Sequence, residues 1–161
     1  MIRIGVISDT HIPHRAKNVP TRVMKLFEGM EMILHAGDLV RLDVLDELSA
    51  LAPVHAVRGN MDEFGGGALP DKKIITAGNW RIGLTHGYGA PLGLAQRVKN
   101  FFEGESLNCI VFGHSHSAHL SDDGGIMLLN PGSPTDTFFS PYLSIAILYA
   151  DEELKGEIIK L

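Results

Sequence analysis

Short apolar segments alternate with helix-like segments along the first half of the chain. Residues 2–8, 32–35 and 53–57 are apolar with little alternation, a pattern typical of strands that are buried on both faces. Between them, residues 20–27 start with proline and residues 39–51 carry leucine at every third position, and both patterns predict helices. An order of strand, helix, strand, helix, strand predicts a parallel sheet with crossover helices.

The second half of the chain differs because turn residues, rather than helices, separate most of its apolar segments. Gly78-Asn79 and Asp122-Asp123-Gly124-Gly125 each lie between two such segments, which predicts two β-hairpins. Apolar residues at helical spacing predict one more helix over 92–102. The predicted strands of this half are 71–77, 80–84, 109–112, 118–120, 126–129, 142–149 and 154–161. We therefore expect an α/β fold of two mixed sheets that pack face to face, with helices on the outside.

The composition is that of an ordinary globular protein, with 45% hydrophobic and 20% charged residues. The 161 residues fit one domain, residues 1–161, with a sizeable core. The net charge of −5 and the lack of a basic tract argue against non-specific binding of nucleic acid. No apolar run approaches the roughly 20 residues of a membrane span. Since the N-terminus leads straight into a strand pattern without a signal peptide, we expect a cytoplasmic protein without membrane partners.

Five apolar segments end in side chains that can bind metal ions. These side chains are Asp9 and His11, Asp38, Asn60, His86, and finally His114 and His116. Ligands at strand ends have the geometry of an α/β site, and Gly113 permits the sharp turn that the last pair requires. Two carboxylates, one amide and four imidazoles are too many for one ion and enough for two. A carboxylate has two oxygens, so one aspartate can bridge two ions about 3.5–4 Å apart.

The donor types narrow the choice of metal and of ligand. Mixed imidazole and carboxylate donors suit manganese, iron, zinc or nickel, and they argue against calcium or an all-oxygen magnesium site. We expect two divalent transition-metal ions, with manganese first. The single cysteine, Cys109, lies in an apolar run and is expected to be a buried thiol rather than a nucleophile or ligand. Two divalent ions and two aspartates leave a charge of about +2, which favours an anion such as a phosphate ester.

The ligand motifs, in their order along the chain, resemble those of the calcineurin-like metallophosphoesterase superfamily. They are Asp9-Thr10-His11, Gly37-Asp38, Gly59-Asn60, His86-Gly87 and Gly113-His114-Ser115-His116. With Asn130-Pro131-Gly132-Ser133 following, the short chain resembles the small, stand-alone phosphodiesterase branch. The resemblance covers about residues 4 to 133 and implies a four-layer α-β-β-α sandwich.

The same resemblance implies a role for each ligand. Asp38 would bridge the two ions. One ion would take Asp9, His11 and His116, and the other would take Asn60, His86 and His114. Asp38, Asn60 and His114 are also candidate catalytic residues. Arg58, which precedes Gly59-Asn60, is a further candidate because its guanidinium matches phosphate geometry, although a surface ion pair is an equal alternative.

One position departs from the phosphomonoesterase branch, in which histidine follows the Gly-Asn motif. Here Met61 follows Asn60, and a methionine cannot donate a proton to a leaving group. Asp62 is expected to play a structural role or to support a metal ligand from behind. A monoester also carries a second negative charge, which favours sites with additional arginines. We therefore expect hydrolysis of a small phosphodiester by a metal-bridging hydroxide, a phosphoric ester hydrolase reaction.

Several alternatives stay open at this point. The chain could be a non-catalytic scaffold, like the retromer subunit that has this fold, or a phosphomonoesterase or nuclease that uses the same site. A scaffold, however, has no reason to retain seven polar ligands at strand ends. A homodimer or a higher homo-oligomer is open, as are the physiological substrate, the native metal and the general acid. His35 and His55 are expected in the core, and His14 and His119 are either substrate contacts or solvated. The glycine-rich residues 63–68 form either a connector or a substrate-side flap.

Overall fold

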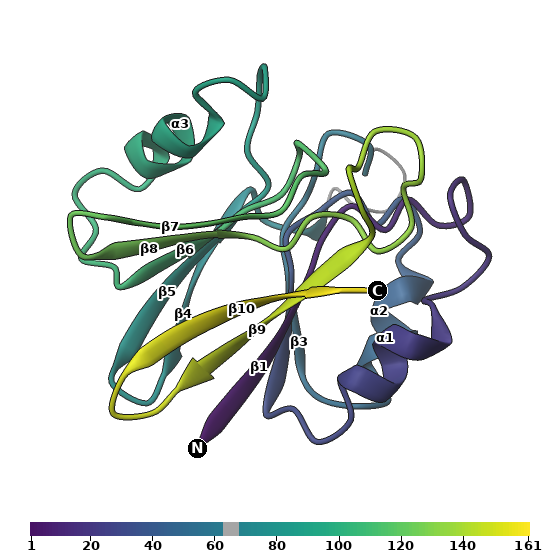
Figure 1. The fold of residues 1–161 in the computed structure, drawn as a ribbon, viewed down its shortest axis with the longest axis horizontal. Helices are drawn as coiled ribbons and strands as arrows, with labels where there is room; N and C mark the ends of the chain where they lie inside the picture. Colours follow the sequence, from purple (N-terminus) through teal and green to yellow (C-terminus); the bar gives the residue numbers. More distant parts are fainter. Residues whose placement is uncertain (63–67) are drawn as a thin grey trace.

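Two five-stranded sheets form the centre of the protein (Figure 1), in a computed structural model that describes residues 1–62 and 68–161. Residues 63–67, which belong to the glycine-rich segment expected to be a connector or a flap, lie outside the described residues. The first sheet contains β1 (Ile2–Ile7), β2 (Met32–His35), β3 (Val54–Ala56), β9 (Ser144–Ala150) and β10 (Leu154–Lys160). The second contains β4 (Lys72–Ala77), β5 (Trp80–Thr85), β6 (Cys109–Val111), β7 (His119–Asp123) and β8 (Ile126–Asn130).

Both sheets are mixed, as the sequence predicts. The strand order is β10-β9-β1-β2-β3 in one and β4-β5-β6-β8-β7 in the other. Strands β1, β2 and β3 are parallel, with Ile4 opposite Met32 and Ile33 opposite Val54. In the second sheet β5, β6 and β8 are parallel, while β4 and β7 join them as antiparallel partners.

Three hydrophobic clusters separate the four layers of an α-β-β-α sandwich. The cluster between the sheets joins Ile4 and Leu148 of the first sheet to Ile82 and Val111 of the second. It also contains Cys109, a buried thiol as expected, whose pKa is raised by burial. The helices α1 (Thr21–Leu26) and α2 (Asp43–Ser49) cover the outer face of the first sheet. The helix α3 (Leu94–Phe101) covers the outer face of the second (Figure 1).

The second helix is shorter than the predicted 39–51. It begins at Asp43 because the residues before it belong to a ligand loop. Val40 has a φ of 72°, and its backbone N–H donates to Oδ1 of Asp62 at 2.7 Å instead of entering a helix. Leu39 is fully buried among the side chains beneath α1 and α2, so its apolar character serves packing and not helix periodicity.

The parallel strands of both sheets point the same way, which brings the loops at their carboxyl ends together. In Figure 1 these loops gather at the end of the sandwich remote from the N-terminus. Asp9 follows β1, Asp38 follows β2, His86 follows β5 and His114 follows β6. Within the two described ranges, no helix combines the length and apolar character needed to cross a membrane.

Candidate metal centre

Most of the predicted ligands occupy a backbone conformation that is costly for a residue with a side chain. Five of the seven have positive φ: Asp9 (55°), His11 (44°), Asp38 (56°), His114 (74°) and His116 (59°). Each such residue costs of order 1–3 kcal/mol, and such strain concentrates at functional sites. The fold therefore accepts strain in several loops at once in order to aim these side chains at one place.

Four of the predicted ligands form one compact group, whose donor atoms all lie within 4.8 Å of one another. The group is Asp9, His11, Asp38 and His116. Nε2 of His11 lies 3.2 Å from Nε2 of His116 and 3.4 Å from Oδ2 of Asp38. Nε2 of His116 lies 3.3 Å from Oδ1 of Asp9. Nitrogen and oxygen atoms that converge in this way from three loops can share one divalent ion.

A second group adjoins the first through Asp38. Nε2 of His86 lies 3.0 Å from Oδ1 of Asn60 and 3.3 Å from Oδ2 of Asp38. The same Asp38 oxygen therefore lies within 3.4 Å of a histidine from each group. The ring of His114 stands at the side of His86, with 5.2 Å between the ring centroids. Nε2–H of His114 donates to the carbonyl of Gly89 at 2.7 Å, so the free lone pair of this imidazole is on Nδ1.

One buried oxygen indicates that these residues fit a metal ion. Oδ1 of Asp9 has no hydrogen-bond partner in the described part of the chain, although the side chain is fully buried. Oδ2 of the same carboxylate accepts bonds from the Ser8 hydroxyl at 2.7 Å and the His114 backbone N–H at 3.0 Å. An unpaired buried carboxylate oxygen is expensive, and a cation among the surrounding imidazoles would satisfy it.

The charges of the cluster are strongly coupled. Burial opposes ionisation of Asp9, but His11, His116 and His86 hold its pKa well below the usual range. Burial likewise opposes protonation of His86, yet Asp38 and Asp9 raise the pKa of His86 to about 9. For His116 the carboxylates of Asp9 and Asp136 also outweigh burial and raise its pKa to about 9. Without a metal, protons take the place of the cation that the carboxylates attract.

Hydrogen bonds behind the cluster orient two of its imidazoles. Nδ1–H of His86 donates to the carbonyl of Ala36 at 2.7 Å. Nδ1–H of His116 donates to Oδ2 of Asp136. Each bond leaves the Nε2 lone pair directed at the cluster, the arrangement by which proteins orient metal-binding histidines.

Asp62 organises the loops that carry Asp38 and Asn60. Its buried carboxylate accepts backbone N–H bonds from Asp38 and Gly59, both at 2.9 Å, and from Val40 at 2.7 Å. A Cβ at Gly59 would lie 2.1 Å from Oδ1 of Asp38, so this position has to be glycine. The structural role expected for Asp62 is confirmed.

Sequence reasoning missed Asp136, because nothing but its position shortly after the Asn130-Pro131-Gly132-Ser133 motif singled it out. The motif itself ties the ligand loops together. Asn130 Nδ2 donates to the carbonyl of Gly113 at 2.9 Å, and the Ser133 hydroxyl donates to the carbonyl of Asp9 at 2.8 Å. Asp136 is fully buried directly beyond this motif, where it meets His116.

Several other candidates lie apart from the cluster. Arg58 donates to Oδ1 of Asp71 at 2.9 Å, and both side chains are largely exposed. His35 is buried as expected, bonded to Gly37 N–H and Thr10, and burial lowers its pKa to about 3. The expectation for His55 is wrong. His55 is only partly buried, because β3 is the edge strand of its sheet in the described part of the chain, and its Nδ1 lies 3.1 Å from Nζ of Lys73.

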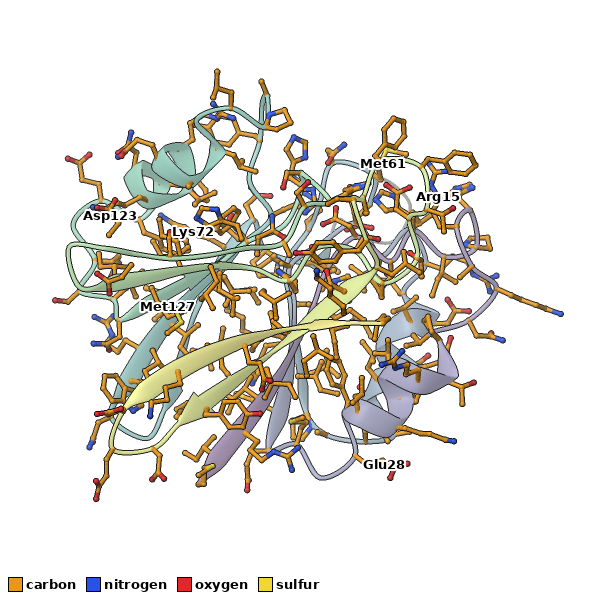
Figure 2. The ribbon with its side chains drawn as sticks, in the orientation of Figure 1. Arg15, Glu28, Met61, Lys72, Asp123 and Met127 are labelled. Carbon is orange, nitrogen blue, oxygen red and sulfur yellow. The ribbon has the colours of Figure 1, made fainter. Side chains whose placement is uncertain are left out.

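Two cavities open next to the ligand cluster. One, of about 390 Å³, is lined by His11, His14, Arg15, Asp38, Asn60, Met61, His114, His116 and Phe139. The other, of about 460 Å³, has Asn60 and His86 on its wall together with Arg58, Asp71, Tyr88 and Phe101. The wall of the first cavity includes candidate metal ligands from both groups. Met61, which is 48% exposed, also lines this wall. Figure 2 shows Met61 and Arg15 at this end of the molecule, on the loop side of the sandwich.

Comparisons with known proteins agree with this arrangement. Residues 2–153 match the calcineurin-like phosphoesterase superfamily domain. A protein of Methanothermobacter thermautotrophicus named probable metallophosphoesterase is 40% identical over 157 residues, which cover 98% of this chain and 91% of that protein. A probable metallophosphoesterase of Methanocaldococcus jannaschii is 36% identical over 159 residues, covering 98% and 81%.

A solved structure extends the comparison. Wild-type Vps29 from Entamoeba histolytica, complexed with Zn²⁺, has a TM-score of 0.75 and 28% identity, with 99% of each chain covered. The matched domain and the cluster of carboxylates and imidazoles together imply a site for divalent metal. The chain belongs to the calcineurin-like phosphoesterase superfamily.

Proposed function

We propose that the protein is a phosphodiesterase that uses two divalent transition-metal ions, with manganese expected first. One observation carries the proposal: Oδ2 of Asp38 lies 3.4 Å from Nε2 of His11 and 3.3 Å from Nε2 of His86. A carboxylate oxygen between two separate sets of donors suits a bridge between two ions. When bound, such ions would supply Lewis acidity toward a phosphoryl group and lower the pKa of coordinated water.

In this proposal the two groups of side chains each hold one ion. Asp9, His11 and His116 serve the first ion, and the unpartnered Oδ1 of Asp9 supports that role. Asn60, His86 and His114 serve the second. Asp38 belongs to both, and its Oδ1 accepts the Met61 backbone N–H at 2.8 Å, so the carboxylate cannot rotate freely.

The shared 390 Å³ cavity is the proposed place for the phosphate ester. Its volume is typical of small-molecule sites. Arg15 and His14 line it and can face the negative charge of a phosphate. Arg58 lines the neighbouring cavity beside Asn60, and it would reach a phosphate only after leaving Asp71.

The diester preference rests on Met61. This side chain lines the cavity where the related phosphomonoesterases are expected to have a histidine, and it offers no proton to a leaving group. A diester with a good leaving group needs less help from an acid. It also carries a single negative charge, which the cations at the cavity can balance more easily.

The deciding experiment compares purified protein before and after chelation and reloading with manganese. Elemental analysis should find two ions per chain, and hydrolysis should depend on them. The loaded enzyme is then assayed on 4-nitrophenyl phosphate and on bis(4-nitrophenyl) phosphate at neutral to mildly alkaline pH. A higher kcat/KM for the bis-ester is expected, and a clear monoester preference would refute the diester proposal while leaving the metal site intact.

Two variants sharpen the result. Met61→His should raise monoester hydrolysis relative to diester hydrolysis, and Met61→Leu is the matched control that keeps the size but adds no proton donor. Asp38→Ala should abolish both metal binding and turnover, because the bridge serves both ions. Near-normal metal content and turnover in Asp38→Ala would contradict the bridging role.

The second candidate function is a non-catalytic binding subunit, since a Vps29 protein shares the fold. The strained backbone at five ligands favours an enzyme over this alternative, because a binding surface elsewhere on the fold would not require that strain. Metal uptake without hydrolysis of any phosphate ester would favour the binding subunit.

A further inference from the structure

Two phenylalanines stand exposed beside the proposed phosphate site. Phe138 and Phe139 are 76% and 73% exposed, on the loop that follows Asp136. Phe139 lines the same cavity as His11, Asp38 and His116. Contiguous exposed apolar surface next to a polar cavity is a common feature of ligand-binding sites.

The loop that carries these rings is attached to a proposed metal ligand. Oδ1 of Asp136 accepts the backbone N–H of Phe138 at 3.0 Å and that of Phe139 at 3.3 Å. Oδ2 of the same carboxylate accepts from His116. One buried side chain therefore sets both the orientation of the imidazole and the position of the two rings relative to it.

Arg15 completes the surface. Its guanidinium carbon lies 4.8 Å from the centroid of the Phe138 ring and 5.7 Å from that of Phe139. Its Nε lies 3.8 Å from Oδ1 of Asp136. A guanidinium plane beside aromatic rings is a surface on which flat, electron-rich groups stack, and the charge also attracts a phosphate.

We propose that Phe139, with Phe138 and Arg15, forms a subsite for a planar aromatic substituent of the substrate, such as a nucleobase or another aryl group. The inference rests on the proposed function and adds a substrate class to it: a phosphodiester with a flat ring next to the phosphate. The ring lies against Phe139 and Arg15 while the phosphate faces the ligand cluster.

The test separates recognition of the ring from the chemistry. Manganese-loaded protein is assayed on bis(4-nitrophenyl) phosphate and on methyl 4-nitrophenyl phosphate, which share a leaving group and differ in the group that stays. The wild-type protein should favour the aryl ester. In Phe139→Leu the ratio of the two kcat/KM values should fall roughly tenfold, mainly through KM, because base–aromatic stacking typically has an effect of that size.

Two further variants provide the comparison. Arg15→Lys keeps the charge but loses the plane, so the ratio should fall in it as well. Tyr142→Leu is the matched control, since its ring also faces a cation, Nζ of Lys160 at 4.2 Å, but does not line the cavity. An unchanged ratio in Phe139→Leu, or an equal fall in Tyr142→Leu, would overturn the proposal.

A binding measurement keeps the inference testable apart from catalysis. Calorimetry of the manganese-loaded protein with phenylphosphonate and methylphosphonate should show about tenfold tighter binding of the phenyl compound, and Phe139→Leu should remove the difference. If neither ester is hydrolysed but this difference is present, the proposed function fails and the subsite stands. Equal binding of both phosphonates by the wild-type protein would reject the subsite and leave the rings as a surface for a macromolecule.

Discussion

Nδ1 of His116 donates to the buried carboxylate of Asp136, although 20 residues separate them in the chain. The contact holds the imidazole with Nε2 toward Asp9 and His11. Such hydrogen bonds raise the basicity of a metal-binding histidine and fix its orientation. Asp136 thus supports the candidate metal site from behind His116 and is not itself one of the candidate ligands.

Replacing Asp136 should therefore weaken metal binding. In Asp136→Asn an amide replaces the carboxylate, and its NH₂ group cannot accept a hydrogen bond from His116 or from the backbone N–H groups of Phe138 and Phe139. We therefore expect about 10–100-fold lower metal affinity. Competition with a metal indicator dye measures this. Asp151→Asn, at an exposed turn, is the control. Equal affinity in the two variants would mean that Asp136 does not support His116.

Asp62 should matter for stability as well as for metal binding. Asp62→Ala leaves three backbone N–H groups without their acceptor, those of Asp38, Val40 and Gly59. Each unsatisfied buried donor costs about 1–3 kcal/mol, so the free energy of unfolding should fall by about 3 kcal/mol or more. Urea denaturation of the metal-free protein measures the change, with Glu152→Gln as an exposed control. A loss below 1 kcal/mol would show that water replaces the carboxylate.

Arg97 should support binding of the second proposed ion, the one assigned to Asn60, His86 and His114. Its guanidinium donates to the carbonyls of Tyr88 at 2.9 Å, Leu92 at 3.1 Å and Ala90, and so shapes the loop whose Gly89 carbonyl accepts from His114. In Arg97→Gln we expect one of the two metal-binding steps, the one that involves His114, to lose affinity several-fold while the other step is unchanged. The matched control is Arg81→Gln, which loses a loop carbonyl contact far from the cluster. Equal effects on both steps would argue against the selective role.

The pH dependence of the metal-free protein follows from His86 and His116, whose pKa values are both raised to about 9. Raised pKa values stabilise the folded state fully below about pH 6.5, and this contribution is lost as the pH rises through about 9. Thermal unfolding of metal-free protein between pH 6.5 and 9.5 should therefore show a falling Tm. The same scan of His116→Gln should fall less steeply; a Tm that rises over this range would contradict the coupling.

Metal binding should show the opposite trend. Each ion displaces one proton from a histidine of raised pKa, so affinity should increase about tenfold per pH unit and level off near pH 9. Indicator competition at several pH values gives the slope for each site. A flat profile would indicate that the two histidines are already neutral in the metal-free protein.

The seven candidate ligands could be found from sequence because each stands where a buried strand ends. An apolar run followed by Asp, Asn or His is a local signal, and parallel strands bring their carboxyl ends to one edge. Two packed sheets with helices outside were predictable because strand and helix periodicities are local, and the family resemblance implied the same four-layer sandwich. The helix at 39–51 was predicted too long because leucine spacing cannot tell a helix from a buried ligand loop at Leu39 and Val40.

Only the tertiary structure decided which side chains meet. Asp38 contacts histidines of two loops, Asp136 reaches back to His116, and Arg15 lies beside Phe138, which is far from it in the sequence. Arg58, adjacent to a ligand in the chain, instead faces Asp71. These pairings depend on how two sheets pack and on how strained loops turn, and neither leaves a periodic signal in the sequence. The chain by itself therefore determined the kinds of donor present, and folding determined their geometry and the surface beside them.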